Sequence, residues 1–406
     1  MVDISQLNLG QRRVFEAAIQ WWKAGAREPF EISGPPGSGK SFLIDAIIDG
    51  IGINRERVAP LAYTGAAAIN MKNHGMYNAK TAHSWLYRAE ITQILDANGN
   101  PIIDPVYNKP KTKINFVERE YIENIDLFVV DEGGSVPPPV RKVIEKHNIP
   151  VIVAGDIDQL PPITGTPAYL NDISKVHVLT EIMRQNQNSA IVNLCQILKN
   201  YDTTKLRTGW YGDVYVIYED QLTPDMVKNS EIIICSRNAT RDKWNRYVRQ
   251  YIEGFPQNDI LPHYGEKLVC RRNNWSREIE DGINLTNGLI GYVTNYDAFY
   301  TLDKSHDFFI IDFKPIMSRY TFTEVPCSFK YFIADTIRRK ELKESPYIAN
   351  NLFEYGYAIT THMSQGSEFS HGIYIEESMN PNIDHKLNYV GLSRFRDYCI
   401  FVKKRH

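Results

Sequence analysis

The stretch PFEISGPPGSGKSFLIDAII, residues 29–48, constrains the fold more than any other part of the chain. A short apolar run of strand type leads into a loop rich in Gly and Pro, and apolar residues at helical spacing follow. Strand, loop and helix in this order form the phosphate-binding unit of an α/β protein. The stretch therefore predicts an α/β fold built on a parallel sheet.

The loop GPPGSGKS, residues 34–41, matches the pattern G-x-x-x-x-G-K-[ST]. In such a loop backbone N–H groups surround phosphate oxygens, and the following helix points its positive end at them. Lys40 is expected to reach the β- and γ-phosphates, and Ser41 to offer its hydroxyl to Mg²⁺. A chance Gly-rich turn is the alternative, which the position between a strand and a helix disfavours. The predicted nucleotide contacts in the loop are Gly34, Pro35, Pro36, Gly37, Ser38, Gly39, Lys40 and Ser41.

A second acidic site is expected in FVVDEGGSVPPP, residues 128–139. Acidic residues followed by Gly and Pro are ordinary turn chemistry, so a plain turn is one interpretation. A P-loop enzyme, however, needs a carboxylate at the end of a neighbouring strand to hold Mg²⁺ and orient the attacking water. We therefore predict Asp131 as a metal ligand together with Ser41, and Glu132 as the group that polarises the water.

Apolar runs of strand length recur along the chain with helical or loop segments between them, and the pattern restarts after residue 186. This alternation favours two α/β lobes, each with a parallel sheet covered on both faces. The runs lie at 57–63, 125–132, 149–156, 230–238, 355–362, 371–377 and 397–404. The expected lobes are residues 1–85 with 118–185, and residues 186–291 with 357–406.

Two stretches interrupt the alternation. Residues 86–117 carry apolar arms around Asn98-Gly99, a strong hairpin-turn pair, and predict a β-hairpin inserted in lobe one. Residues 292–356 contain aromatic, alternating pieces, which favour a small antiparallel SH3-like barrel or sheet inserted in lobe two.

Composition limits the partners. The formal net charge is −2, so no global basic surface indicates nucleic acid or membrane, and a polyanion must bind in a local groove. The five cysteines are scattered without a C-x-x-C pair, which indicates neither a zinc site nor a disulfide framework and favours a reducing compartment. No signal-like apolar segment opens the chain, so we expect a soluble, cytoplasmic protein without a membrane partner.

Four further motifs follow the loop and the acidic pair in a fixed order: GDIDQLPP (155–162), LTEIMRQ (179–185), TTHMSQGSEF (360–369) and YVGLSRFR (389–396). Together they resemble superfamily-one DNA helicases, most closely the RecD-like and Dda-like group that moves 5′ to 3′. The resemblance extends from Gln11 to Arg396. It implies two RecA-like lobes that bind ATP and Mg²⁺ and drive translocation on single-stranded DNA with unwinding of duplexes.

The resemblance assigns roles to further residues of the nucleotide site. Gln11 would hydrogen-bond the adenine edge, and Glu368 would contact the ribose. Gln159 would sense the γ-phosphate, while Arg184 and Arg394 would be arginine fingers on the transferring phosphoryl group. Each of these residues has an ordinary alternative: a helix-start Gln, a turn residue, a solvated carboxylate or a surface Arg.

The resemblance also implies DNA contacts along the top of both lobes. The residues concerned are mostly neutral hydrogen-bonding residues, which suit binding of a nucleic-acid backbone without sequence discrimination. The hairpin resembles a separation pin that the lobe-two insert braces, with a structural β-ribbon as its alternative. This chain departs from the family pattern at two places. It has Met363 where relatives commonly carry a lysine. After the acidic pair it has Gly133-Gly134-Ser135, where relatives tend to have a single small residue before the serine. The implied contacts are Thr64, His83, Ser84, Asn238, Thr361, His362 and Ser364.

Three functions stay open on the sequence. The first is a DNA-dependent ATPase that unwinds duplexes 5′ to 3′, acting as a monomer on single-stranded and forked DNA beside single-strand-binding or replisome proteins. The second is a translocase that displaces proteins without separating strands, and the third a P-loop switch without motor activity. RNA stays open as a track, because backbone contacts discriminate weakly. So does the process served, whether replication, repair or recombination.

Overall fold

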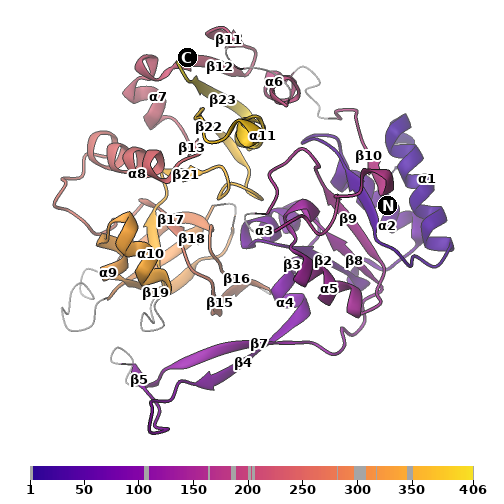
Figure 1. Cartoon of the computed structure of the whole chain (residues 1–406), viewed down its shortest axis with the longest axis horizontal. Coiled ribbons are helices and arrows are strands. Elements are labelled where there is room, and N and C mark those ends of the chain that lie inside the picture. The colour runs from indigo at the N-terminus through magenta and orange to yellow at the C-terminus, as the bar shows by residue number, and fades with distance from the viewer. Residues whose placement is uncertain are drawn as a thin grey trace.

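The computed structural model describes residues 3–104, 109–162, 165–183, 189–199, 203, 206–280, 282–296, 308–316, 318–344 and 351–405. Two parallel sheets lie at the centres of two lobes, and a smaller antiparallel sheet lies beside them (Figure 1). The predicted α/β class is confirmed. Within the described residues, no helix has the length and apolarity to cross a membrane.

Lobe one contains a six-stranded parallel sheet of order β10-β1-β9-β8-β2-β3. Its four central strands are buried along their whole length, as expected for apolar runs covered on both faces. The strands are β1 Phe30–Ser33, β2 Val58–Ala62, β3 Lys80–Thr81, β8 Leu127–Val130, β9 Val151–Gly155 and β10 Val176–Val178. The helices are α1 Leu9–Lys23, α2 Lys40–Ile51, α3 Gly65–Asn73, α4 Ala82–Leu86 and α5 Pro138–Lys146.

Lobe two contains a second six-stranded sheet of order β11-β12-β23-β22-β13-β21, in which β11 pairs antiparallel and the other strands pair parallel. Its strands are β11 Gly209–Tyr211, β12 Val214–Tyr218, β13 Ile232–Cys235, β21 Ala358–Thr360, β22 Phe369–Ile375 and β23 Phe395–Lys403. Its helices are α6 Ala190–Leu198, α7 Pro224–Lys228, α8 Asn238–Tyr247 and α11 Pro381–Leu392.

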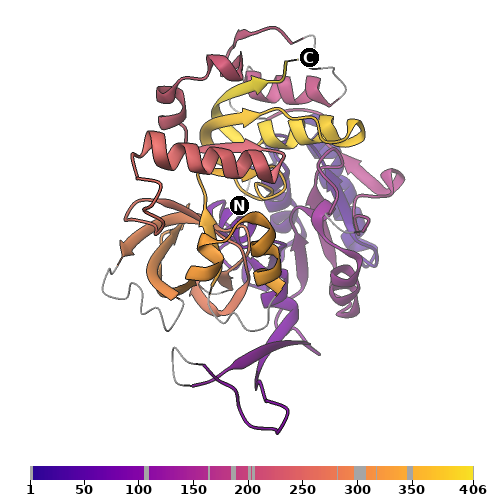
Figure 2. The same cartoon turned by 60° about the vertical axis from the view of Figure 1, so that its left-hand side comes forward.

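The described residues between 267 and 355 form what we call the antiparallel module, a five-stranded sheet of order β19-β18-β17-β14-β20 with two short helices (Figure 2). The expected insert began at residue 292, but β14 precedes it and bonds to both β17 and β20. The module comprises β14 Lys267–Cys270, the hairpin β15 Asn274–Glu280 with β16 Ile283–Leu285, β17 Ile290–Tyr296, β18 Phe308–Pro315, β19 Phe322–Ser328, α9 Phe329–Ile333, α10 Thr336–Glu344 and β20 Phe353–Tyr355.

A hairpin occupies the stretch in which the sequence predicts one, and it projects away from both lobes (Figure 1). Its arms are β4 Tyr87–Gln93 and β7 Thr112–Glu118, and a short pair, β5 Ile103–Asp104 with β6 Lys109–Pro110, extends it. At the turn, Gly99 has φ +82°, and the Asp96 carboxylate accepts the backbone N–H groups of Asn98 and Asn100. Glycine suits this left-handed backbone.

The turn after β8 is a 3₁₀ turn, Gly133–Ser135, whose two glycines have different surroundings. A Cβ atom on Gly133 would lie 2.2 Å from Val153 Cγ1 on β9. A Cβ atom on Gly134 would meet only the Asp156 carbonyl oxygen, at 3.9 Å. Close packing against the sheet therefore requires the first glycine and leaves room at the second.

This difference predicts opposite tolerance to alanine. Gly133→Ala should lower the free energy of unfolding by about 1–3 kcal/mol, the usual cost of forcing an extra methyl group into a packed site. Gly134→Ala is the matched control and should change it by less than about 0.5 kcal/mol. Urea denaturation followed by circular dichroism measures both, and equal losses for the two variants would contradict the packing argument.

Candidate functional site

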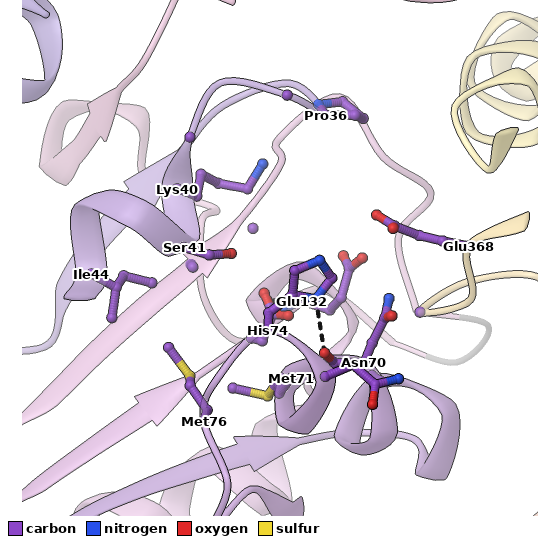
Figure 3. A pocket seen from close by; sticks show the side chains of 18 of the residues that line it. Pro36, Lys40, Ser41, Ile44, Asn70, Met71, His74, Met76, Glu132 and Glu368 are labelled. Carbon is purple, nitrogen blue, oxygen red and sulfur yellow. Dashed lines mark hydrogen bonds between the residues drawn. The ribbon is translucent and has the colours of Figure 1, made fainter. Parts of the chain in front are cut away.

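A cavity of about 570 Å³ opens where the two lobes meet (Figure 3). Lobe one supplies the phosphate loop with the start of α2 and the acidic pair after β8. Lobe two supplies Glu368 and Arg394. In Figure 3 the Lys40 and Glu368 side chains point into the cavity from opposite sides. Motifs far apart in the sequence thus converge on one site.

The phosphate loop has a backbone conformation suited to binding an anion. Gly37 and Gly39 have φ of +79° and +75°, left-handed values that glycine adopts without strain and that phosphate-binding loops use. The Lys40 ammonium donates to the carbonyl oxygens of Gly34 at 2.6 Å and Pro35 at 3.1 Å. Burial lowers the pKa of Lys40, against the pull of the nearby carboxylates. A lysine ammonium held in a glycine-rich loop at the start of a helix suits phosphate oxygens.

Asp131 and Glu132 end β8 beside this loop. The Asp131 carboxylate accepts the backbone N–H of Glu132 at 2.9 Å. Glu132 itself has φ +52°, a left-handed conformation uncommon for a residue with a side chain. Burial raises the pKa of both carboxyls, and the positive charges of Lys40 and Arg394 oppose the rise. Two desolvated carboxyls beside a lysine are typical of a site that receives a cation.

Arg394 reaches the acidic pair from the other lobe. It follows α11, is only 5% exposed, and places Nη1 3.9 Å from Glu132 Oε1. Its guanidinium also donates to the Val390 carbonyl oxygen at 3.2 Å and to Ser393 Oγ at 3.1 Å. The arginine is therefore oriented by its own helix end. Arg184, the other predicted finger, lies outside the described residues.

Further contacts join the lobes at the rim of the cavity. The Tyr389 hydroxyl on α11 donates to the Asp156 carboxylate after β9, and burial with that carboxylate raises the pKa of Tyr389. Lys199 forms an ion pair with Asp158. Gln159, on the same loop, lines the cavity, and its Oε1 atom is buried without a hydrogen-bond partner among the described residues. Its amide therefore has bonding capacity left for a ligand.

Gln11 lies at the start of α1, the position that the sequence offered as the alternative to adenine contact. It is fully buried and completes a capping box with Asn8 at the start of α1. Its Nε2 atom donates to the Ser38 carbonyl oxygen at 3.1 Å, which ties α1 to the phosphate loop. Both ends of the amide are thus used within the chain, and the predicted contact with adenine stays a prediction.

The cavity has lining residues that sequence reasoning missed. His74 and Asn70 come from the last turn of α3, and His74 Nδ1 lies 2.8 Å from the Asn70 carbonyl oxygen (Figure 3). Arg396 follows Arg394 on β23. No motif marks α3 as part of the nucleotide site, because only the packing of the helix against β2 and β3 brings its end there.

A second cavity, of about 670 Å³, forms a groove between the two lobes and the antiparallel module. Three predicted DNA contacts line it: Thr64, Asn238 and His362. Glu132 and Gly366 line both the groove and the nucleotide cavity. The two cavities therefore share part of one wall.

Thr361 and Ser364 do not line the groove, and their predicted DNA contacts stay predictions. Both are fully buried. Thr361 Oγ1 donates to the Cys235 carbonyl oxygen at 3.2 Å, and Ser364 Oγ donates to the Thr361 carbonyl oxygen at 2.8 Å. Their hydroxyls hold the motif loop in shape, and the exposed surface of the loop comes from its neighbours.

His83 and Ser84 lie at the base of the hairpin, outside the groove lining. The His83 ring contacts the rings of Tyr87, Phe116 and Trp275, and burial lowers its pKa. Ser84 Oγ donates to the Gly282 carbonyl oxygen at 3.3 Å. Both residues thus connect lobe one to the β15–β16 hairpin of the antiparallel module, and their predicted DNA contacts stay predictions.

Comparisons with known proteins agree with this arrangement. A family model described as an AAA domain matches residues 6–218, more than half of the chain. A curated relative, an uncharacterized protein of Methanocaldococcus jannaschii, is 21% identical over 451 residues. That match covers 89% of this chain and 35% of the relative, so the chain spans about a third of the relative's length.

Solved structures of Pif1 helicases share the fold. One, described as the structural basis for DNA unwinding at forked dsDNA by two coordinating Pif1 helicases, is 19% identical, with a TM-score of 0.55. The match covers 98% of this chain and 92% of that one. Bacteroides Pif1 in complex with ADP-AlF3 and ssDNA is 18% identical, with coverage of 95% and 91% and a TM-score of 0.51. The likeness extends over both RecA-like lobes.

The position of Gln11 leads to a test of its role. Gln11→Ala should weaken ATP and GTP binding equally, by about fivefold, because loss of the bond to Ser38 costs about 1 kcal/mol and loosens a loop that holds either nucleotide. Asn8→Ala, which removes the cap and leaves that bond, is the control and should change affinity little. Titration with fluorescent ATP and GTP analogues measures both, and loss of ATP binding alone would instead favour adenine recognition.

Proposed function

We propose that this chain, which belongs to the AAA-domain family, is an ATP-dependent DNA helicase that moves 5′ to 3′ on single-stranded DNA and unwinds duplexes. The observation that carries the proposal is the cavity in which the phosphate loop and acidic pair of one lobe face Arg394 of the other. The Pif1 structures of the same fold, one with ADP-AlF3 and ssDNA, support it.

ATP and Mg²⁺ are the proposed substrate and cofactor, and the residues present fit both. The phosphate loop with Lys40 suits the phosphates, and the partly buried Asp131 carboxylate with the Ser41 hydroxyl, which lines the same cavity, offers hard oxygen donors of the kind that Mg²⁺ prefers. Ser41 and Asp131 would hold the ion, which when bound neutralises charge on the phosphate oxygens. Glu368 would face the ribose.

The chain's own side chains perform the hydrolysis step in this proposal. Glu132 orients the attacking water and accepts its proton, a task for which its raised pKa suits it. Lys40 and Arg394 place positive charge where negative charge develops on the phosphoryl oxygens. Gln159 has bonding capacity left to respond to the γ-phosphate. Because Arg394 belongs to lobe two, its engagement favours the closed arrangement of the lobes.

The groove is the proposed track for single-stranded DNA. Thr64, Asn238 and His362 offer neutral hydrogen bonds from both lobes, as expected for contacts to a backbone. The projecting hairpin is the proposed separation pin. Leu95, near its tip, is 52% exposed, so an apolar surface is present that could replace base stacking at a fork.

Polarity and motor activity can be tested together. On forked substrates with a single tail, the protein should separate strands only when the tail is 5′, and single-stranded DNA should raise its ATP turnover. Lys40→Ala should abolish both activities, and Glu132→Gln should keep nucleotide binding while turnover falls by roughly 10²–10⁴-fold. Strand separation only from the 3′ tail would overturn the polarity, and absence of DNA stimulation would favour a P-loop switch.

The hairpin distinguishes a helicase from a translocase that displaces proteins. Replacing Leu95 and Ile102 with Gly removes the apolar arms beside the turn, and should reduce strand separation while DNA-stimulated ATP turnover is kept. Streptavidin displacement from a biotinylated single strand measures translocation in the same variant. Unwinding at the wild-type rate by the variant would contradict the role of the pin.

A further inference from the structure

The third wall of the groove belongs to the antiparallel module, which contributes Arg271, Asn287, Gly288 and Lys343. None of these residues belongs to a motif that the sequence marked as a DNA contact. Arg271 and Lys343 carry positive charge, whereas the predicted DNA contacts that line the same groove are neutral residues. The positive charge among the residues that line the groove therefore comes from the module, whereas lobe one contributes the Glu132 carboxylate.

Arg271 stands beside the one position where the motif loop lacks an expected cation. It follows β14, and its Nη1 atom lies 2.9 Å from the Met363 sulfur. Met363 occupies the place in TTHMSQG where the resemblance to superfamily-one helicases led us to expect a lysine. A guanidinium from a distant segment is thus present at the point where the loop itself offers only a thioether.

Lys343 adds a second charge at the same wall, from the last turn of α10. Partial burial and the nearby positive charge of Arg271 lower the pKa of Lys343, since like charges held close disfavour each other. The Glu354 carboxylate, whose charge opposes this effect, is 4% exposed and accepts from Arg271 Nε at 3.1 Å. Glu354 also pairs with Arg241 at 3.2 Å. One buried carboxylate is therefore shared between two arginines.

We propose that Arg271 and Lys343 bind the phosphate backbone of the strand in the groove, and that Arg271 supplies the positive charge that Met363 does not. A phosphate backbone between Arg271 and Lys343 offsets the repulsion between these two cations, so binding of the polyanion is favoured. Contacts to phosphate carry no sequence information, in keeping with the neutral hydrogen-bonding side chains opposite. This inference rests on the proposed function, to which it adds the antiparallel module as a third DNA-binding surface.

The salt dependence of binding tests the proposal. Each phosphate contact to a cation contributes about 0.7 to the slope of log Kobs against log salt for a single strand. Lys343→Gln and Arg271→Gln should each reduce the slope by about this amount, measured by anisotropy of a fluorescent oligo-dT. Arg271→Lys should keep the slope. Lys340→Gln removes an exposed charge from the same helix α10 outside the groove lining, and should leave the slope unchanged.

A charge swap gives an independent readout. Met363→Lys in the Arg271→Gln background returns a cation to the same place and should restore the lost slope. Lys343 is exposed, so its variant tests the proposal even if Arg271→Gln perturbs the buried Glu354. Binding of oligo-dT with wild-type slopes in both single variants would overturn this inference alone. No binding of oligo-dT by the wild-type protein would overturn the DNA-binding function and the inference with it.

Discussion

Gly133 packs so closely against Val153 of β9 that no side chain fits between the turn and the sheet. This contact fixes the path of the chain as it leaves β8, and with it the left-handed backbone of Glu132. Backbone strain of this kind persists only where the surroundings hold it in place. The position of the acidic pair, and so the geometry of the whole nucleotide cavity, depends on this packing.

The lobes meet through buried and partly buried polar groups around that cavity. Arg394 approaches Glu132, Tyr389 bonds Asp156, and Lys199 pairs with Asp158. Charged groups removed from water need partners, because an unpaired buried charge is costly. The partners here belong to different lobes, so the separation of the lobes exposes the same groups to water. The interface therefore suits repeated opening and closing better than an apolar interface would.

The sequence predicted those parts of the fold and the nucleotide site whose structure depends on a few consecutive residues. The strand-loop-helix of the phosphate loop and the strand before Asp131 were readable because each spans a few consecutive residues. The sequence could not show that Thr361 and Ser364 turn their hydroxyls inward, since a motif position carries no side-chain direction. It likewise could not place His74 in the nucleotide cavity or Arg271 beside Met363, because tertiary packing alone brings those pairs of segments together. The start of the antiparallel module was missed because β14 is a short apolar run like those of the lobes.

Gly366 and Glu132 form part of a partition with the nucleotide on one side and the groove on the other. A Cβ atom on Gly366 would lie 2.9 Å from Thr64 Oγ1 and 3.0 Å from Ala67 Cβ, so the lobe-two loop lies directly against α3. A ligand in the nucleotide cavity and a ligand in the groove would both lie against Glu132 and Gly366. Equilibrium linkage then makes the effect reciprocal: the factor by which nucleotide changes the affinity for a strand equals the factor by which the strand changes the affinity for nucleotide. Because the two cavities share lining residues, nucleotide and strand would be effectors of each other in the proposed function.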